Sequence, residues 1–186
     1  MKRLLLNIGR LSFILFVVGT PHMGSSQPSE YLLKAVFFEK LARFIEWPDD
    51  KEKHNSNHFV IGIAGEDPFE KQLSAIYAEH KIKNRDVKIK YLQSPDDVDD
   101  CHLVFLSNSK KYPVKSILKS VKNRPILTVS DSDELSGSGV LVNLLLKGKH
   151  IGLEIDESAV NQSGLQISYL LLKEAKIIHP IGQKSK

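Results

Sequence analysis

Apolar and polar residues recur along the chain with periods that differ from one segment to the next. Between residues 30 and 47 the apolar positions recur every three or four residues, which predicts an amphipathic helix. Pro48 ends this segment, because a residue that precedes proline is disfavoured in helical geometry. The main apolar face of the helix consists of Tyr31, Ala35, Phe38, Leu41, Ala42 and Ile45. We expect this face to be buried against the rest of the domain.

The apolar arc of this helix is wider than the stripe that a surface helix normally buries. Leu33, Phe37 and Phe44 lie beside the main face and widen the arc to roughly 200°. A helix of this kind contacts two apolar surfaces. The second surface belongs to a neighbouring helix, to a second copy of the chain or to a partner protein, and packing within the chain is the default interpretation.

Short apolar runs alternate with helical segments downstream. The predicted strands are residues 59–64, 87–92, 103–106 and 125–129, and residues 113–121 are a predicted helix. After a turn at Gly65, the residues Asp67, Pro68 and Glu70 form a helix-start signal. Residues 94–97 are typical of one short helical turn.

The last third of the chain predicts a hairpin followed by two helices. Residues 140–146 and 150–155 flank Lys147-Gly148-Lys149, a pattern typical of a β-hairpin. Asp156 is the predicted N-cap of a short helix that Gly164 ends. Ser168 is the predicted N-cap of a last helix that runs through residue 178.

This order of elements indicates the fold class. Strands that alternate with helices imply a sheet covered on both faces, parallel in its early strands and antiparallel at the hairpin. We therefore predict an α/β fold, a three-layer α/β/α sandwich with a Rossmann-like, mixed, mostly parallel sheet and a C-terminal β-hairpin. The sequence shows no internal repeat and no linker between domains, so we expect residues 27–186 to form a single domain.

Residues 1–26 have the features of a secretory signal peptide. Lys2 and Arg3 are followed by an apolar stretch over residues 11–19 and by small residues at 24–26. We predict cleavage near Ser26 and export to the periplasm, and an uncleaved anchor is the alternative. Removal of this segment leaves 23 basic and 22 acidic side chains, so the mature chain lacks the positive charge that nucleic-acid binding requires.

No motif in the sequence predicts catalysis. The turn after residues 59–64 lacks the glycine spacing of a dinucleotide site, and the histidines lack the spacing of a zinc site. Cys101 and His102 are adjacent, so in a strand their side chains point to opposite faces and cannot act as nucleophile and base together. The acidic loop of Asp131, Asp133 and Glu134 lacks the pattern of a calcium loop, so we interpret it as solvated. We predict no catalytic residue, no cofactor and no metal.

Several motifs in a fixed order resemble one known family. They are KAVF at residues 34–37, FIEWP at 44–48, GEDPF at 65–69, CHLVFLS at 101–107, PILTVSD at 125–131, LEI at 153–155 and GLQIS at 164–168. Their order and spacing are similar to those of the YfiR family of periplasmic regulatory proteins, and the resemblance covers residues 31–178, nearly the whole of the mature chain.

This resemblance implies a function by binding. A YfiR-like protein is expected to be a dimeric periplasmic regulator without enzymatic activity. Its expected partner is the periplasmic portion of an inner-membrane diguanylate cyclase or sensor kinase, which it represses or modulates and through which it affects cyclic-di-GMP signalling and biofilm formation. The family's best-known member carries intramolecular disulfides, whereas Cys101 is the only cysteine of this chain. Redox control through an intramolecular disulfide is therefore excluded here.

Five residues are candidates for contact with the partner. Leu33, Phe37 and Phe44 follow from the helix geometry, and Trp47 is a candidate hot-spot aromatic, although we favour a core position for it. Glu154 points away from its neighbours in a strand, and it either pairs with a cation within the chain or contacts the partner.

The alternative function is a periplasmic small-ligand sensor or solute-binding protein. Its site would use the loops at residues 65–67, 107–111 and 131–139, because ligands bind open α/β sheets at the carboxyl ends of strands.

Overall fold

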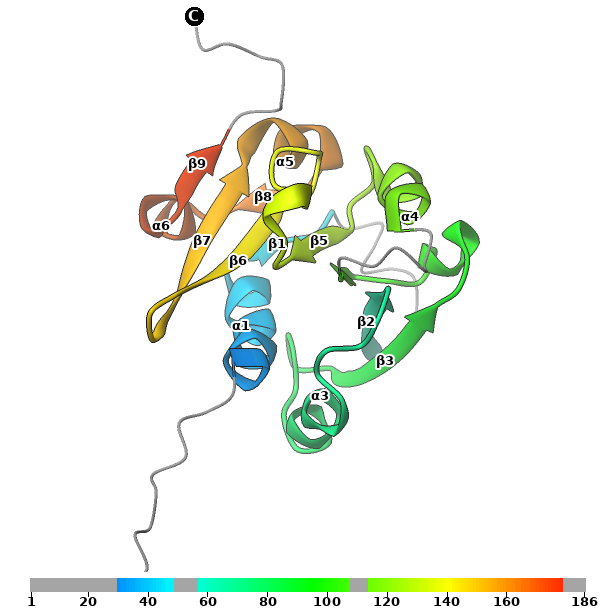
Figure 1. Cartoon of the computed structure of the whole chain (residues 1–186). Helices are drawn as coiled ribbons and strands as arrows, with labels where there is room; N and C mark the ends of the chain where they lie inside the picture. Colours follow the sequence, from blue (N-terminus) through cyan, green and yellow to red (C-terminus); the bar gives the residue numbers. More distant parts are fainter. Residues whose placement is uncertain (1–29, 49–56, 108–113, 179–186) are drawn as a thin grey trace, which may run out of the picture.

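A central seven-stranded sheet organises the chain (Figure 1). The computed structural model describes residues 30–48, 57–107 and 114–178, so the predicted signal peptide at residues 1–26 lies outside the described residues. The strands of the sheet are β2 (His58–Ala64), β3 (Asp86–Leu92), β4 (Leu103–Leu106), β5 (Leu127–Ser130), β6 (Val142–Lys147), β7 (His150–Asp156) and β9 (Lys176–Ile178). Their spatial order is β3-β2-β4-β5-β6-β7-β9.

The sheet is parallel except at one pair of strands. Strands β2 to β6 pair in parallel, and β7 runs antiparallel to β6 as the predicted hairpin. Gly148 occupies the two-residue turn of this hairpin with a φ of 63°, which suits a residue without a Cβ. The parallel pairing of β7 with β9 then closes this edge of the sheet.

Helices cover both faces of the sheet. The helices are α1 (Glu30–Arg43), α3 (Lys71–Tyr77), α4 (Val114–Val121), α5 (Glu157–Ser163) and α6 (Tyr169–Glu174), with short 3-10 turns η1 (Pro95–Val98) and η2 (Asp133–Leu135). Alternate residues of β2 belong to two apolar clusters: Phe59 and Ile61 pack with α1 and α3, and Val60 packs with α4. Figure 1 shows α1 and α3 on one side of the sheet and α4 on the other. The predicted three-layer α/β sandwich is thus confirmed.

The first helix is shorter than the sequence predicts. It ends at Arg43, and the amide of Phe44 donates to the carbonyl of Leu41 at 3.0 Å in a tight turn. The next residues form the strand β1 (Ile45–Glu46), which pairs antiparallel with β8 (Gln166–Ile167). This pairing between distant segments replaces the last predicted helical turn.

Two other helix boundaries differ from the prediction. Asp67 does not cap α3: its Oδ1 accepts a hydrogen bond from the amide of Phe69 at 2.8 Å, and the helix begins at Lys71. The last helix ends at Glu174 rather than at residue 178, because Lys176–Ile178 pair with β7 as strand β9. By contrast, Asp156 and Ser168 are N-caps, and Gly164 ends α5 as predicted.

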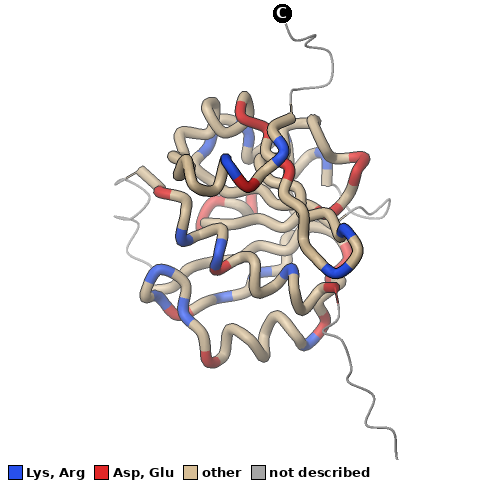
Figure 2. Tube along the Cα trace, turned by 90° about the vertical axis from the view of Figure 1, so that its left-hand side faces the viewer, with Lys and Arg blue, Asp and Glu red and all other residues tan. Residues whose placement is uncertain are grey.

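Most charged residues are not segregated by sign along the chain, although the charged residues of α4 are all lysines. Figure 2 shows Lys and Arg interspersed with Asp and Glu along the trace. Within the described ranges, no helix has the length and apolar character that a membrane crossing needs.

Candidate functional site

The inner face of α1 is fixed firmly to the sheet. Ala35, Phe38 and Leu41 are fully buried. The ring of Phe38 packs at 5.4 Å from that of Phe69 and at 5.8 Å from that of Phe105. Tyr77 of α3 donates a hydrogen bond from its hydroxyl to the carbonyl of Ala35 at 2.7 Å. The outer side of the helix is therefore held in a defined orientation.

A charged cluster also holds α1. Lys34 is only 2% exposed, and its Nζ pairs with Glu30 on the preceding turn and with Asp131 at 2.7 Å. The same Nζ lies 4.7 Å from the ring centre of Tyr31. Burial, together with the carboxylate of Asp131, raises the pKa of Tyr31 to about 12. The cluster thus joins α1 to the carboxyl end of β5.

The sequence does not predict the ion pair between Asp131 and Lys34. It indicates a solvated acidic loop around Asp131, and the structure corrects this interpretation because Asp131 forms an ion pair with a buried lysine. The available signal was a lysine within the apolar face of the first helix, between Tyr31 and Phe38. Over the described part of the chain, no cluster of His, Cys, Asp and Glu side chains is suited to hold a metal ion.

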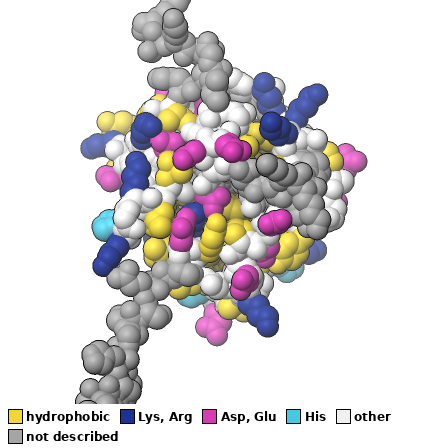
Figure 3. All heavy atoms as spheres, viewed as in Figure 1, with side chains coloured by type: hydrophobic (Ala, Val, Ile, Leu, Met, Phe, Trp, Pro, Cys, Tyr) yellow, Lys and Arg dark blue, Asp and Glu magenta, His cyan; other side chains and the backbone are white. Residues whose placement is uncertain are grey.

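The outer side of α1 presents apolar side chains to solvent. Leu33 and Phe37 are half-buried one turn apart, and Val36 between them is 50% exposed. We call these three residues the α1 flank. Lys40 lies beside them, with its Nζ 4.9 Å from the ring centre of Phe37. Figure 3 shows hydrophobic side chains at the surface over α1, close to acidic ones.

Phe44 connects α1 to a second exposed apolar element. Its half-buried ring packs against the core cluster, and its carbonyl accepts a hydrogen bond from the amide of Ser168 at 2.8 Å. Ser168 caps α6, whose first two residues, Tyr169 and Leu170, are 71% and 63% exposed. The sequence does not predict the exposure of these two residues, because a helix of six residues gives no clear periodicity.

Trp47 lies apart from the α1 flank, in the core. Its exposed fraction is 9%, and its Nε1 donates to the carbonyl of His102 at 3.3 Å. Its ring meets that of Phe59 edge-on at 5.5 Å. These contacts agree with the core position that we favoured for Trp47.

Glu154 also lies apart, on the other face of the sheet. Its neighbours Leu153 and Ile155 pack in the same cluster as α1, so Glu154 points away from that helix. Its Oε1 accepts a hydrogen bond from Lys176 at 2.8 Å, and its Oε2 accepts one from Ser136 at 2.9 Å. The bond from Lys176 is the main reason that the pKa of Glu154 lies below its ordinary value. Of the two interpretations of Glu154, pairing with a cation is the one with an observed contact.

Cys101 and His102 point to opposite faces of the sheet. Cys101 is fully buried in the cluster on the α4 side, close to Gly62. His102 stacks on Phe59 at 4.9 Å, and its Nδ1 accepts a hydrogen bond from the amide of Val60 at 3.1 Å. The two side chains therefore cannot act as a nucleophile and its base.

Comparison with known proteins identifies the family of the chain. A search of curated proteins gave no match. A family model described as YfiR/HmsC-like matches residues 31–176, from the first turn of α1 to the start of β9. This match includes the α1 flank, the Lys34–Asp131 ion pair and every strand of the sheet except the last two residues of β9. The chain therefore belongs to the YfiR/HmsC-like family, a family of periplasmic regulators linked to cyclic-di-GMP signalling rather than of enzymes.

Proposed function

We propose that this protein is a periplasmic repressor that binds the periplasmic portion of an inner-membrane diguanylate cyclase or sensor kinase. Membership of the YfiR/HmsC-like family is the observation that carries the proposal. The α1 flank supports it, because a rigid helix with partly exposed aliphatic and aromatic side chains is a suitable anchor for a protein partner. Export by the predicted signal peptide and a homodimeric state belong to the same proposal.

Repression by binding requires a preference between two states of the partner. A binder that changes an equilibrium from 1:99 to 99:1 must bind the favoured state more tightly by about 5.5 kcal/mol. Apolar contact supplies such a preference only if the matching surface exists in one state of the partner alone. Leu33, Phe37 and Phe44 are the proposed anchor residues, and Trp47 contributes by supporting the end of α1 from within the core. Glu154 is proposed to act on a different face, where it fixes β9.

A photo-crosslinker at Val36 tests contact directly. Val36 and Tyr91 are equally exposed, at 50% and 51%, but Tyr91 lies on β3 at the far edge of the sheet. We expect a crosslinker at Val36 to form an adduct with an inner-membrane protein that mass spectrometry identifies as a cyclase or kinase. The same group at Tyr91 should form no such adduct. Equal labelling of the partner from both positions would contradict docking through the α1 flank.

A functional measurement complements the crosslinking. Phe37→Ala removes much of the apolar surface of the flank but leaves Phe38 and the rest of the inner face in place. We expect signalling output in cells, measured as cyclic-di-GMP for a cyclase partner, to rise toward that of cells without the protein. The thermal midpoint of the purified variant serves as the control for folding. Unchanged repression by Phe37→Ala would argue against this residue as an anchor.

A further inference from the structure

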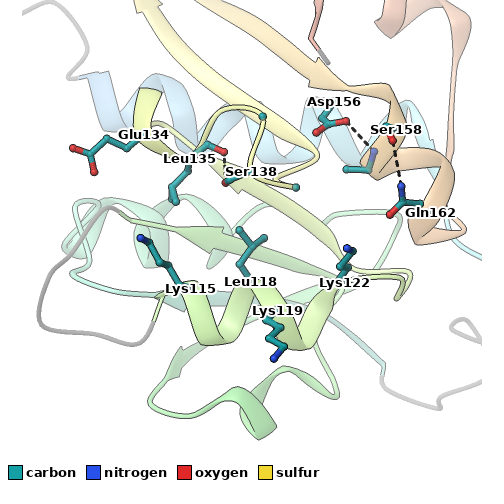
Figure 4. A pocket seen from close by; sticks show the side chains of 13 residues that line it. Lys115, Leu118, Lys119, Lys122, Glu134, Leu135, Ser138, Asp156, Ser158 and Gln162 are labelled. Atoms are coloured by element: carbon teal, nitrogen blue, oxygen red, sulfur yellow. Dashed lines mark hydrogen bonds between the residues drawn. The ribbon is translucent and has the colours of Figure 1, made fainter. Parts of the chain in front are cut away.

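A cavity of about 690 Å³ lies between α4, which packs on the opposite side of the sheet from α1, and α5, which packs against the same apolar cluster as α1. Three segments that are distant in the sequence form its walls: α4, the loop at residues 134–139, and the start of α5 (Figure 4). Leu118, Leu135 and Ala159 supply apolar surface. This volume lies in the range of cavities that bind small organic ligands.

Lys115 of α4 and Lys122, the residue that follows this helix, place positive charge at the cavity. Figure 4 shows the amines of Lys115 and Lys122 pointing toward the loop and α5, whereas Lys119 points away from them. Among the described residues, neither Lys115 nor Lys122 has an ion-pair partner. An anionic ligand in the cavity can therefore gain charge-assisted hydrogen bonds from these lysines without breaking an existing pair of the described structure.

Asp156 adds an acceptor to the wall of the same cavity. Its residue is only 1% exposed, and its Oδ1 caps α5 by accepting from the amide of Ala159 at 2.9 Å. Its Oδ2 is buried and has no hydrogen-bond partner in the described structure. Figure 4 shows this second oxygen on the side of the carboxylate that faces the cavity. A buried carboxylate oxygen without a donor costs free energy, so the site favours a ligand that supplies one.

We propose that this cavity binds a small phosphate ester that carries free hydroxyl groups, the class of the sugar and polyol phosphates. Lys115 and Lys122 hold the phosphate, and the Oδ2 of Asp156 accepts a hydrogen bond from a hydroxyl of the ligand. Leu118, Leu135 and Ala159 pack against the carbon skeleton. The lining of the cavity shares no residue with the α1 flank, so ligand binding and partner docking use different residues of the described structure.

Titration of the purified protein, expressed as the full chain, with glucose 6-phosphate tests the proposal. We expect saturable changes in the amide NMR resonances of α4, the loop at residues 134–139 and the start of α5. Inorganic phosphate alone and glucose alone should each bind more weakly by roughly tenfold or more, because each offers only part of the hydrogen bonding. Absence of saturable changes at these residues at millimolar ligand would overturn the proposal.

Variants separate the contributions of the two lysines and of Asp156. The double variant Lys115→Gln with Lys122→Gln should weaken binding of both glucose 6-phosphate and inorganic phosphate by roughly tenfold or more. Lys88→Gln is the matched control, because it removes the same charge from an exposed position on β3 that does not line the cavity. Because the control removes one charge, it is compared with the single variant Lys115→Gln. If both variants weaken ligand binding equally, the effect comes from the net charge of the protein, and the proposed site is overturned.

Asp156→Asn tests the hydroxyl contact without removing the helix cap. Asparagine retains a carbonyl oxygen that can cap α5, but it presents an amide donor where the second carboxylate oxygen stood. We expect this variant to keep its thermal midpoint within a few degrees and to lose the preference for glucose 6-phosphate over inorganic phosphate. A folded Asp156→Asn protein that keeps the full preference would overturn the assigned contact.

Discussion

Lys34 shows how a single buried charge can determine the position of a helix. Its Nζ has two carboxylate partners, of which Asp131, at 11% exposed, is more buried than Glu30, at 37% exposed. Loss of one partner of a buried charge costs more than loss of an exposed ion pair, because the remaining charge stays out of water. The Lys34–Asp131 pair therefore contributes to the orientation of the α1 flank.

We predict that Asp131→Asn lowers the free energy of unfolding by about 2 kcal/mol, the cost of removing a charged partner from a buried lysine. Urea unfolding measures this loss. Arg43→Gln on the same helix is the control: it breaks the exposed pair with Glu39, in which the arginine is 69% exposed, and should cost less than about 1 kcal/mol. If the two variants lose equal stability, the burial of Lys34 has no special energetic effect.

The lowered pKa of Glu154 predicts that its contribution to the free energy of unfolding decreases at acidic pH. Its folded-state pKa is lowered below 4.5, chiefly by the hydrogen bond from Lys176. A carboxyl group with a lowered pKa contributes stability that is present above its unfolded pKa and is lost as the pH falls through the folded value. We expect the stability difference between the native protein and Glu154→Gln to be constant from pH 7 to about pH 5 and to shrink below the ordinary pKa of glutamate. Unfolding at a series of pH values measures it, and a difference that persists unchanged at pH 3 would contradict this assignment.

At the scale of elements, local signals placed most helices and strands but did not set all of their ends. Apolar runs predicted β2 and β4, and the hairpin turn predicted β6 and β7. Where the prediction was wrong, residues predicted to be helical pair instead with a strand distant in the sequence: β1 pairs with β8, and β9 pairs with β7. Such pairing gains hydrogen bonds that periodicity within one segment cannot reveal. For the same reason, the cavity between α4, the loop at 134–139 and α5 could not be predicted. Of the proposed ligand loops, the one at 131–139 contributes to its lining and the one at 65–67 does not, whereas residues 108–111 of the third lie outside the described residues.

Gly164 is an element boundary that the sequence predicted correctly, and its backbone explains why. It ends α5 with a φ of 79°, a conformation that disfavours a side chain, and no atom lies within 4 Å of the position of an added Cβ. We predict that Gly164→Ala destabilises the protein by about 1 kcal/mol through backbone strain alone. Gly164→Asn should cost less, because asparagine tolerates this conformation better. Chemical denaturation of both variants tests the order, and equal losses would point to another cause.

At the scale of the whole molecule, packing must supply the stability that disulfides supply in a family member that has them. The single cysteine rules out an intramolecular disulfide. Cys101 is fully buried, and an added Cβ at Gly62 would lie only 2.9 Å from its Sγ. The thiol thus fills space between β2 and the start of β4. A disulfide between two chains would require this part of the core to open.

We therefore predict that the folded protein does not respond to the redox state of its surroundings. Its thermal midpoint should be the same with and without reductant. A difference of 1 kcal/mol in stability changes the midpoint of a domain of this size by roughly 2–4 °C, and we expect a smaller change than that. Signalling output should be the same for the native protein and for Cys101→Ala, apart from any effect of a modest loss of packing. Non-reducing electrophoresis together with the output measurement checks both statements. A covalent dimer through Cys101 that forms under native conditions and changes the output would show that the core opens, and it would restore a redox function that burial of the thiol otherwise prevents.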